Sequence, residues 1–188
     1  MTIKTFYCNP YRECTYIVEV SRETGESANR KECIIIDPGM YGEKEEKRVL
    51  DYLEEHQLTP VAILITHRHP DHICGLECLQ THFPSLPIID YQTQSIPPFE
   101  GGPKWVSIPT PGHKEDSVCF YFEKEKVLFT GDTLFQESIG RADLPGGDMP
   151  TLIRSLEILK KLPDDTQVYP GHGYPTTIGH EKEYNPYL

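Results

Sequence analysis

The chain has 188 residues, of which 37% are hydrophobic and 25% are charged, a balance typical of a folded globular protein and not of a disordered one. Acidic residues outnumber basic residues 29 to 18, and the formal net charge of −11 disfavours binding to nucleic acid. No stretch reaches the roughly 18 apolar residues of a membrane span and the N-terminus shows no signal peptide, so we expect a cytoplasmic protein without a membrane partner.

The hydrophobic pattern predicts strands in sequential groups, with helices between them. Strands are predicted at 3–8, 14–20, 33–37, 61–65, within 84–90, and at 105–108, 117–122, 126–130 and 167–169. Helices are predicted at 42–57 and 72–83, through the leucines between 152 and 162, and briefly in the tail. The polar or Gly/Pro-rich stretches 21–32, 91–103 and 145–150 are predicted loops. This order indicates an α/β fold with sheets covered by helices, in one domain.

Six cysteines, at positions 8, 14, 33, 74, 78 and 119, form no CxxC pair. In a chain without a signal peptide we expect them to be reduced thiols. Cys74 and Cys78 are four positions apart in a predicted helix, so they share a face. We expect that face to pack in the core.

The run 66–72, with the sequence THRHPDH, holds four potential metal ligands, which are His67, His69, Asp71 and His72. It follows the apolar run 61–65, so the histidines begin where a buried strand ends. Side chains two positions apart in an extended chain face the same side, and the two histidines before the proline can converge on one point. Pro70 keeps its predecessor extended and then allows a turn, which directs the last two ligands towards a second point nearby.

Three further candidate ligands each lie beside a glycine, at or just beyond the end of an apolar strand, and are His113, Asp132 and His172. Glycine permits tight turns there, and strand ends along a sheet edge commonly form a site. The whole inventory of five histidines and two aspartates fits two metal ions. Nitrogen and carboxylate ligands favour zinc, and iron or manganese would also fit. His56, His82 and His180 have no such neighbours and are predicted surface residues.

These residues resemble the metallo-β-lactamase superfamily, and within it the small single-domain hydrolases that are similar to glyoxalase II. The resemblance is carried by Thr66-His67-x-His69-x-Asp71-His72, Pro111-Gly112-His113, Gly131 to Phe135, the stretch 138–148, and a tail with Gly171-His172-Gly173, Thr176, Gly179, Glu181, Asn185 and Pro186. These motifs span nearly the whole chain in the family's order. The resemblance implies a four-layer αβ/βα sandwich with a dinuclear site, in a single domain of residues 1–188.

The resemblance also divides the ligands between two metals. It implies that metal one is held by His67, His69 and His113, and metal two by Asp71, His72 and His172, with Asp132 bridging both. A metal can lower the pKa of a bound water to about 7, so a metal-bound hydroxide would attack the substrate carbonyl. Asp71 is the expected catalytic residue, which orients the hydroxide or carries its proton. Because metal would also stabilise a thiolate leaving group, we expect a small-molecule thioester of the hydroxyacylglutathione type as substrate.

The sequence departs from classical glyoxalase II in the regions that determine the substrate. Only 16 residues follow His172 in the sequence, so we expect no C-terminal helical domain of the kind that helps the classical enzyme bind glutathione. Where that enzyme has a basic residue and then, two positions later, a tyrosine, this chain has Arg141 and Asp143. Arg141 is a candidate contact for an anionic substrate group, with a salt bridge within its loop as the alternative. Lys114 stands where small polar residues are usual, and its role stays open.

Other activities on the same fold stay open. A mononuclear iron persulfide dioxygenase would use two histidines and one carboxylate, and the matching positions are His67, His113 and Asp132. A hydrolase of another ester or phosphoester is a second alternative, although enzymes with long nucleic-acid substrates usually carry insertions for which this chain has no room. A non-catalytic metal-binding protein is disfavoured, because seven ligands on two metals still leave coordination positions for water.

Overall fold

The structure is a computed structural model, and it describes residues 1–20, 31–93 and 104–188. Most of the predicted loops 21–32 and 91–103 therefore lies outside the described residues. The described chain divides into two compact units. The first contains residues 1–20, 31–65, 69–89, 93 and 104, and the second contains residues 66–68, 90–92 and 105–188.

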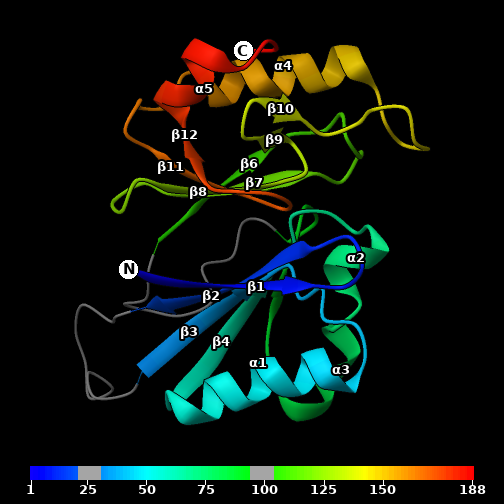
Figure 1. Cartoon of the computed structure of the whole chain (residues 1–188), viewed down its shortest axis with the longest axis vertical. Coiled ribbons are helices and arrows are strands. Elements are labelled where there is room, and N and C mark those ends of the chain that lie inside the picture. Colours follow the sequence, from blue (N-terminus) through cyan, green and yellow to red (C-terminus); the bar gives the residue numbers. More distant parts are fainter. Residues whose placement is uncertain (21–30, 94–103) are drawn as a thin grey trace. The chain divides into compact units, whose positions relative to one another are not determined.

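The first unit is built on a mixed sheet with the strand order β1-β2-β3-β4-β5 (Figure 1). Its strands are β1 (Thr2–Cys8), β2 (Glu13–Val20), β3 (Lys31–Ile36), β4 (Leu58–Leu64) and β5 (Ile88–Ile89). The first three strands pair antiparallel, and β3, β4 and β5 run parallel. The unit also contains the helices α1 (Glu43–Glu55), α2 (Pro70–Ile73) and α3 (Leu76–His82). Val49 and Leu53 of α1 and Leu79 of α3 are buried in one core with Ile35 and Ile63 of the sheet.

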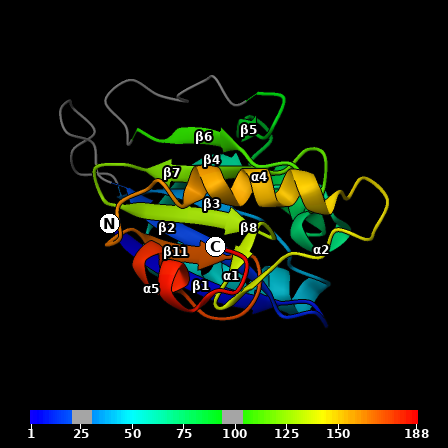
Figure 2. The same cartoon turned by 90° about the horizontal axis from the view of Figure 1, so that it is seen from above.

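The second unit is built on a second mixed sheet, with the order β12-β11-β8-β7-β6. Its strands are β6 (Val106–Pro109), β7 (Val118–Phe122), β8 (Val127–Gly131), β11 (Gln167–Pro170) and β12 (Thr176–Thr177), and β9 (Leu134–Phe135) with β10 (Ser138–Ile139) forms a separate small hairpin. Figure 2 shows helix α4 (Met149–Leu159) lying along this sheet, with α5 (Ile178–Tyr184) beside it. Leu152, Leu156 and Leu159 recur at helical spacing, and all three are buried in the core of the unit.

The predicted elements are present among the described residues, with most ends shifted by one or two positions. One continuous helix over 72–83 is wrong, because the chain forms two helices that are separated at Cys74 and Gly75. The Gly75 N–H donates to the Pro38 carbonyl at 2.8 Å and so is withdrawn from the helical hydrogen-bond ladder. The predicted loop 145–150 ends too late, because Asp148 caps α4 by accepting from the Thr151 N–H.

All six cysteines are thiols that form no disulfide with one another. Burial raises the pKa of the Cys8 thiol to about 11 and that of Cys33 to about 12, so these two groups stay protonated at neutral pH. The core packing expected for Cys74 and Cys78 is wrong, because both side chains are only partly buried. The helix that was expected to give them a common face is interrupted between them.

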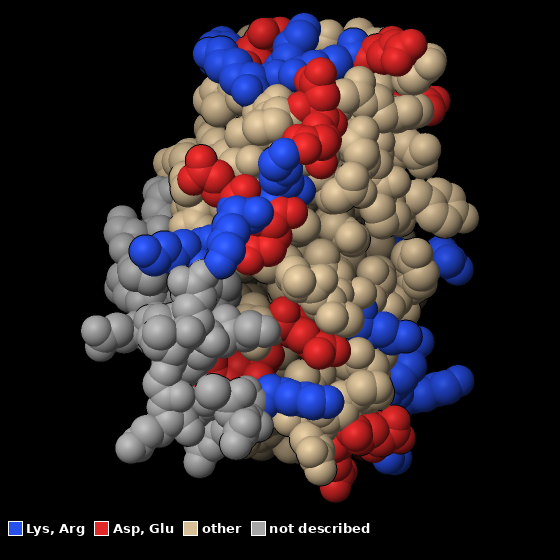
Figure 3. All heavy atoms as spheres, turned by 90° about the vertical axis from the view of Figure 1, so that its left-hand side faces the viewer, with Lys and Arg blue, Asp and Glu red and all other residues tan. Residues whose placement is uncertain are grey.

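No helix among the described residues is long and apolar enough to cross a membrane. On the face of the molecule in Figure 3, basic and acidic side chains are interspersed among the described residues. That face therefore presents a mixed pattern of charge.

Candidate metal centre

The seven predicted ligands divide between the two units. His69, Asp71 and His72 belong to the first unit, and the second contains the other four, His67, His113, Asp132 and His172. The boundary between the units therefore falls inside the run 66–72. Within each unit, the chain brings ligands of that unit close together.

The first unit presents its three ligands on a sharp turn. His69 is extended, with φ −73° and ψ 146°, and Pro70 then begins helix α2, as the sequence predicted. The His72 N–H donates to the His69 carbonyl at 3.0 Å and closes the turn. Asp71 Oδ2 lies 3.9 Å from His72 Nε2, so the two ligands after the proline face each other.

Two carboxylates hold the buried His72 ring from the side opposite Asp71. His72 Nδ1 lies 3.0 Å from Asp37 Oδ2 and 3.9 Å from Glu13 Oε1. Asp37 directly follows β3 and has a φ of 46°, a conformation that aspartate tolerates better than most residues. Because a carboxylate only accepts hydrogen bonds, Asp37 fixes a proton on Nδ1 and leaves Nε2 of neutral His72 with its lone pair.

The second unit groups its ligands around Asp132. Asp132 Oδ2 lies 3.6 Å from His113 Nε2 and 3.7 Å from His172 Nε2. The rings of His67 and His113 meet edge to face, with centroids 4.9 Å apart. Asp132 directly follows β8, His172 lies two residues beyond β11, and His113 lies on the turn after β6. These three predicted ligands thus lie at or beyond strand ends of one sheet, as predicted.

A main-chain carbonyl orients His113. Its Nδ1 lies 2.7 Å from the carbonyl oxygen of Arg141. A carbonyl only accepts, so Nδ1 carries the proton and Nε2 of the neutral ring carries the lone pair. That lone pair is on the nitrogen atom closest to Asp132 Oδ2.

The same pairing of atoms therefore occurs in both units. His72 Nε2 with Asp71 Oδ2 in the first unit, and His113 Nε2 with Asp132 Oδ2 in the second, bring a nitrogen lone pair to within 3.9 Å and 3.6 Å of a carboxylate oxygen. A nitrogen lone pair and a carboxylate oxygen at this distance can bind one cation between them. A set of imidazole nitrogens and carboxylate oxygens fits zinc, iron or manganese, so the residues present fit a divalent metal ion.

Two glycines allow the chain to pass close to these ligands. Gly131 has a φ of +49°, and a Cβ there would lie 2.2 Å from Thr66 Oγ1. A Cβ on Gly140 would lie 1.8 Å from the carbonyl oxygen of Asp132 and 3.1 Å from His113 Nδ1. A side chain at either position would displace the segment that carries Asp132.

The side chains of Arg141 and Lys114 are both engaged by carboxylates. The Arg141 guanidinium makes two hydrogen bonds of 2.7 Å to Asp143, an exposed pair that lowers the pKa of Asp143 to about 2. The loop salt bridge considered for Arg141 is therefore present. Lys114 Nζ lies 3.0 Å from both carboxylate oxygens of Asp116.

The C-terminal residues that the sequence singled out hold the β9–β10 hairpin. The buried Glu181 accepts hydrogen bonds from the Glu137 N–H and from Asn185 Nδ2, each at 2.8 Å. Asn185 Nδ2 also donates to the Ser138 carbonyl at 3.0 Å. Phe135 of the same hairpin lies edge-on to the ring of His172, with centroids 6.3 Å apart. The tail therefore fixes a hairpin that contacts a predicted ligand.

Sequence reasoning missed the groups that orient the histidines. Asp37 had a signal, because an acidic residue directly follows a buried strand and precedes Pro38-Gly39. Glu13 had no such signal, since only the fold brings β2 to His72. The Arg141 carbonyl is a main-chain group, so no side-chain pattern could reveal it.

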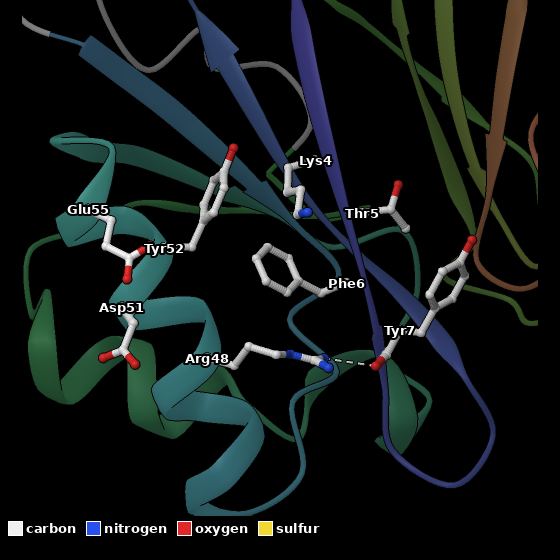
Figure 4. A pocket seen from close by; sticks show the side chains of 8 residues that line it. All are labelled: Lys4, Thr5, Phe6, Tyr7, Arg48, Asp51, Tyr52 and Glu55. Atoms are coloured by element: carbon white, nitrogen blue, oxygen red, sulfur yellow. Dashed lines mark hydrogen bonds between the residues drawn. The ribbon is translucent and has the colours of Figure 1, made fainter.

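A separate pocket of about 440 Å³ lies between β1 and α1 in the first unit (Figure 4). Arg48 donates to the Tyr7 carbonyl at 2.8 Å along its wall. Lys4 Nζ lies 5.7 Å from the ring centroids of Phe6 and Tyr52. None of the seven predicted ligands lines this pocket.

The chain is similar in sequence to known proteins. The model of the metallo-beta-lactamase superfamily matches residues 25–94 and 98–172. Hydroxyacylglutathione hydrolase GloC of Haemophilus influenzae is 36% identical, over 85% of this chain and 89% of the relative.

Solved structures match almost the whole chain. The B3 metallo-beta-lactamase BLEG-1 is 32% identical, with a TM-score of 0.82 over 100% of this chain and 99% of that one. TTHA1623, solved in a di-iron-bound form, is 32% identical, with a TM-score of 0.79 over 98% of this chain and 100% of that one. These likenesses confirm the predicted fold, an α/β fold with two mixed sheets flanked by helices.

Proposed function

This chain belongs to the metallo-beta-lactamase superfamily, and on that premise we propose that it is a metal-dependent hydrolase of the glyoxalase II type, which cleaves small-molecule thioesters. The observation that carries the proposal is the pairing of a histidine Nε2 with a carboxylate oxygen, which recurs in both units. In each pair, a second group holds the histidine proton on Nδ1. Histidines prepared in this way are typical of metal sites, where the remaining nitrogen binds the ion.

The proposed ligand sets follow the family's motif. His67, His69 and His113 would hold one ion, Asp71, His72 and His172 the other, and Asp132 would bridge them. Divalent ions in such a site act as Lewis acids and provide a nucleophilic water at neutral pH. Zinc is the proposed metal, and the di-iron-bound form of TTHA1623 supports iron as the principal alternative.

Asp71 is the proposed catalytic residue. One of its carboxylate oxygens lies on the side of His72 Nε2, and the other would orient the attacking water and take up its proton. Replacing Asp71 with asparagine removes the proton acceptor and keeps the shape of the side chain. We expect Asp71→Asn to lose hydrolysis even where it keeps its metal, and a metal-replete, active Asp71→Asn variant would contradict this role.

The thioester assignment is supported by the likeness to a hydroxyacylglutathione hydrolase. Arg141 is the proposed contact for an anionic group of the substrate. Its guanidinium is exposed and paired with Asp143, and because exposed ion pairs contribute little to stability, a substrate anion would have to displace only a weak interaction. We expect no nucleic-acid or membrane partner, and a small-molecule thioester as the substrate.

The decisive assay compares substrates on one metal-replete preparation. Glutathione and coenzyme A thioesters, a simple ester, a phosphodiester and a β-lactam are each tested, with the Asp71→Asn variant as the blank for metal carried in solution. We expect the highest kcat/KM on a thioester. The β-lactam is included because the chain is similar to BLEG-1. A higher kcat/KM on the β-lactam than on any thioester would overturn the thioester assignment.

The second candidate is a mononuclear iron dioxygenase acting on persulfides. The observation that favours it is the close grouping of His67, His113 and Asp132 within the second unit, which matches the two histidines and one carboxylate of such a site. About one iron per chain, together with oxygen consumption on a persulfide, would select this function over thioester hydrolysis.

A further inference from the structure

Asn9, on the turn between β1 and β2, joins three segments of the first unit. Its side-chain Nδ2 donates to the Gly39 carbonyl at 3.0 Å and to the Asp71 carbonyl at 2.9 Å. Its Oδ1 accepts from the Tyr11 N–H at 3.0 Å. Its own N–H donates to Glu45 Oε2 of α1 at 2.8 Å.

The partners of Asn9 fix the orientation of its amide. Two carbonyls can only accept and one N–H can only donate, so the nitrogen faces the carbonyls and the oxygen faces the N–H. Asn9 also has a φ of 49°, in the left-handed region where asparagine is enriched. Asparagine therefore supplies both the backbone conformation and the two donors at this position.

The Asp71 carbonyl needs this donor because the helix after it is interrupted. In a continuous helix, the Asp71 carbonyl would accept from the N–H four residues later, at Gly75. The Gly75 N–H donates instead to the Pro38 carbonyl at 2.8 Å. Asn9 Nδ2 takes the vacated place, and it ties the four-residue helix α2 to the rest of the unit.

The loop at Gly39 is held at the same place. The Gly39 N–H donates to Thr15 Oγ1 at 2.9 Å, and the Thr15 hydroxyl donates to Glu13 Oε2 at 2.9 Å. A Cβ on Gly39 would lie 2.2 Å from the Asp71 carbonyl oxygen. The backbone at Gly39 thus lies so close to the Asp71 carbonyl that only glycine fits there. Asn9 bridges these same two segments through their carbonyls.

We propose that Asn9 is a positioning residue, which holds the turn bearing Asp71 and His72 in the orientation needed to bind the second metal ion and to accept the proton of the attacking water. The inference rests on the proposed function, because it takes the roles of these two residues from there. Asn9 acts only through the Asp71 main chain. Loss of the Asn9 hydrogen bonds leaves the Asp71 and His72 side chains present but lets the turn that carries them rotate.

The test measures metal binding by the metal-free protein, before any activity. Wild type and Asn9→Gly are titrated with Co²⁺, whose visible absorption reports each binding step. Asn9→Gly keeps the left-handed backbone conformation and removes both donors. We expect the affinity for the second metal ion to fall about 10-fold to 100-fold, the range for a lost orienting contact. The affinity for the first ion should stay within about twofold of wild type.

Asn9→Asp is a second test variant, in which an acceptor replaces the Nδ2 donor. It keeps the acceptor for the Tyr11 N–H but turns a carboxylate oxygen towards the two carbonyls that Asn9 Nδ2 bonded. We expect a larger loss in the second step than in Asn9→Gly. In turnover assays of metal-saturated protein, both variants should lower kcat and leave KM nearly unchanged, since the substrate contacts are intact.

Lys182→Met is the matched control, because it removes a side chain that bridges two segments of the second unit through the Leu162 carbonyl and Asp164, and neither of these partners is a predicted ligand. This control should lower the melting temperature and leave the affinity for the second metal ion unchanged. Equal weakening of both steps in Asn9→Gly, or no weakening of either, would overturn the inference. If wild type itself binds a single ion or cleaves no thioester, the proposed function fails, whereas a normal wild type with an unaffected Asn9→Gly variant refutes only the role of Asn9.

Discussion

The two units orient their histidines by different means. In the first unit, a buried side chain, Asp37, holds His72 Nδ1 at 3.0 Å, with a second carboxylate, that of Glu13, close by. In the second unit, the Arg141 main-chain carbonyl holds His113 Nδ1 at 2.7 Å. The ring is prepared in the same way in both, with its proton on Nδ1.

The difference determines which substitutions can break each half. A side-chain acceptor is removed by one substitution, so the first unit is sensitive at Asp37 itself. A main-chain acceptor survives any change of its own side chain, so the second unit is sensitive where added volume displaces the backbone, at Gly140. Orientation of a histidine therefore depends on a carboxylate side chain in the first unit and on the absence of a side chain at Gly140 in the second.

The largest effect is expected from Gly140→Ala. The new Cβ would lie 1.8 Å from the Asp132 carbonyl oxygen, and a backbone atom has little freedom to move aside. We expect a loss of about 3 kcal/mol in the free energy of unfolding, at the upper end for overpacking, together with loss of metal binding. Denaturant unfolding measures the first quantity.

The control for that prediction is Gly42→Ala, at a φ of +76° with no atom within 4 Å of the place where the new methyl group would lie. Its backbone, with φ 76° and ψ 163°, has a conformation nearly exclusive to glycine, so Gly42→Ala should cost about 1–3 kcal/mol and leave metal binding intact. If Gly42→Ala also loses metal binding, close approach at Gly140 is not the cause.

Asp37→Ala comes next. Removing this acceptor frees the His72 ring to turn, and we expect about 10-fold to 100-fold weaker binding of one metal ion. Asp37→Asn is the matched variant, because its amide oxygen still accepts from Nδ1 and asparagine tolerates the φ of 46°. Titration calorimetry on metal-free protein should place Asp37→Asn between wild type and Asp37→Ala. Identical affinities for all three proteins would remove Asp37 from this role.

Arg141→Ala should leave metal affinity within twofold of wild type, because the carbonyl that holds His113 remains. If Arg141 binds an anionic substrate group, KM for a charged thioester rises and KM for an uncharged one does not. A large fall in metal affinity would mean that the side chain, and not the carbonyl, orients His113.

The smallest effect concerns the pKa of Asp143, which Arg141 lowers from its ordinary value of 3.8 to about 2. Because the folded-state pKa is depressed, the pair contributes to stability above about pH 3.8. That contribution is lost as the pH falls towards 2. In Arg141→Ala, an NMR titration of the Asp143 carboxyl carbon should give a pKa near 3.8, and an unchanged value near 2 would contradict the pairing.

The sequence predicted the features that depend on local pattern. Apolar runs marked the strands, and Pro70 and the glycines beside His113, Asp132 and His172 placed ligands at turns. Each of these signals lies within a few residues of the predicted ligand that it positions, so the local sequence is enough to reveal it. The division of the ligand sets between metals came from the family resemblance and stays a proposal.

The features that escaped prediction depend on residues far apart in the chain. The break between α2 and α3 arises because Pro38 takes the Gly75 N–H, and the periodicity of the helix gives no sign of it. The hairpin of β9 and β10 is two residues long on each side, too short for an alternating pattern. Its position depends on Glu181 in the tail.

If the chain binds two metal ions through separately oriented histidines, the number of ions bound per chain reveals it. Wild type, His72→Ala and Arg141→Ala are loaded with zinc, freed of excess metal and analysed by elemental mass spectrometry. We expect two ions in wild type, two in Arg141→Ala and one in His72→Ala. A single ion in wild type that persists in His72→Ala would contradict binding of two metal ions.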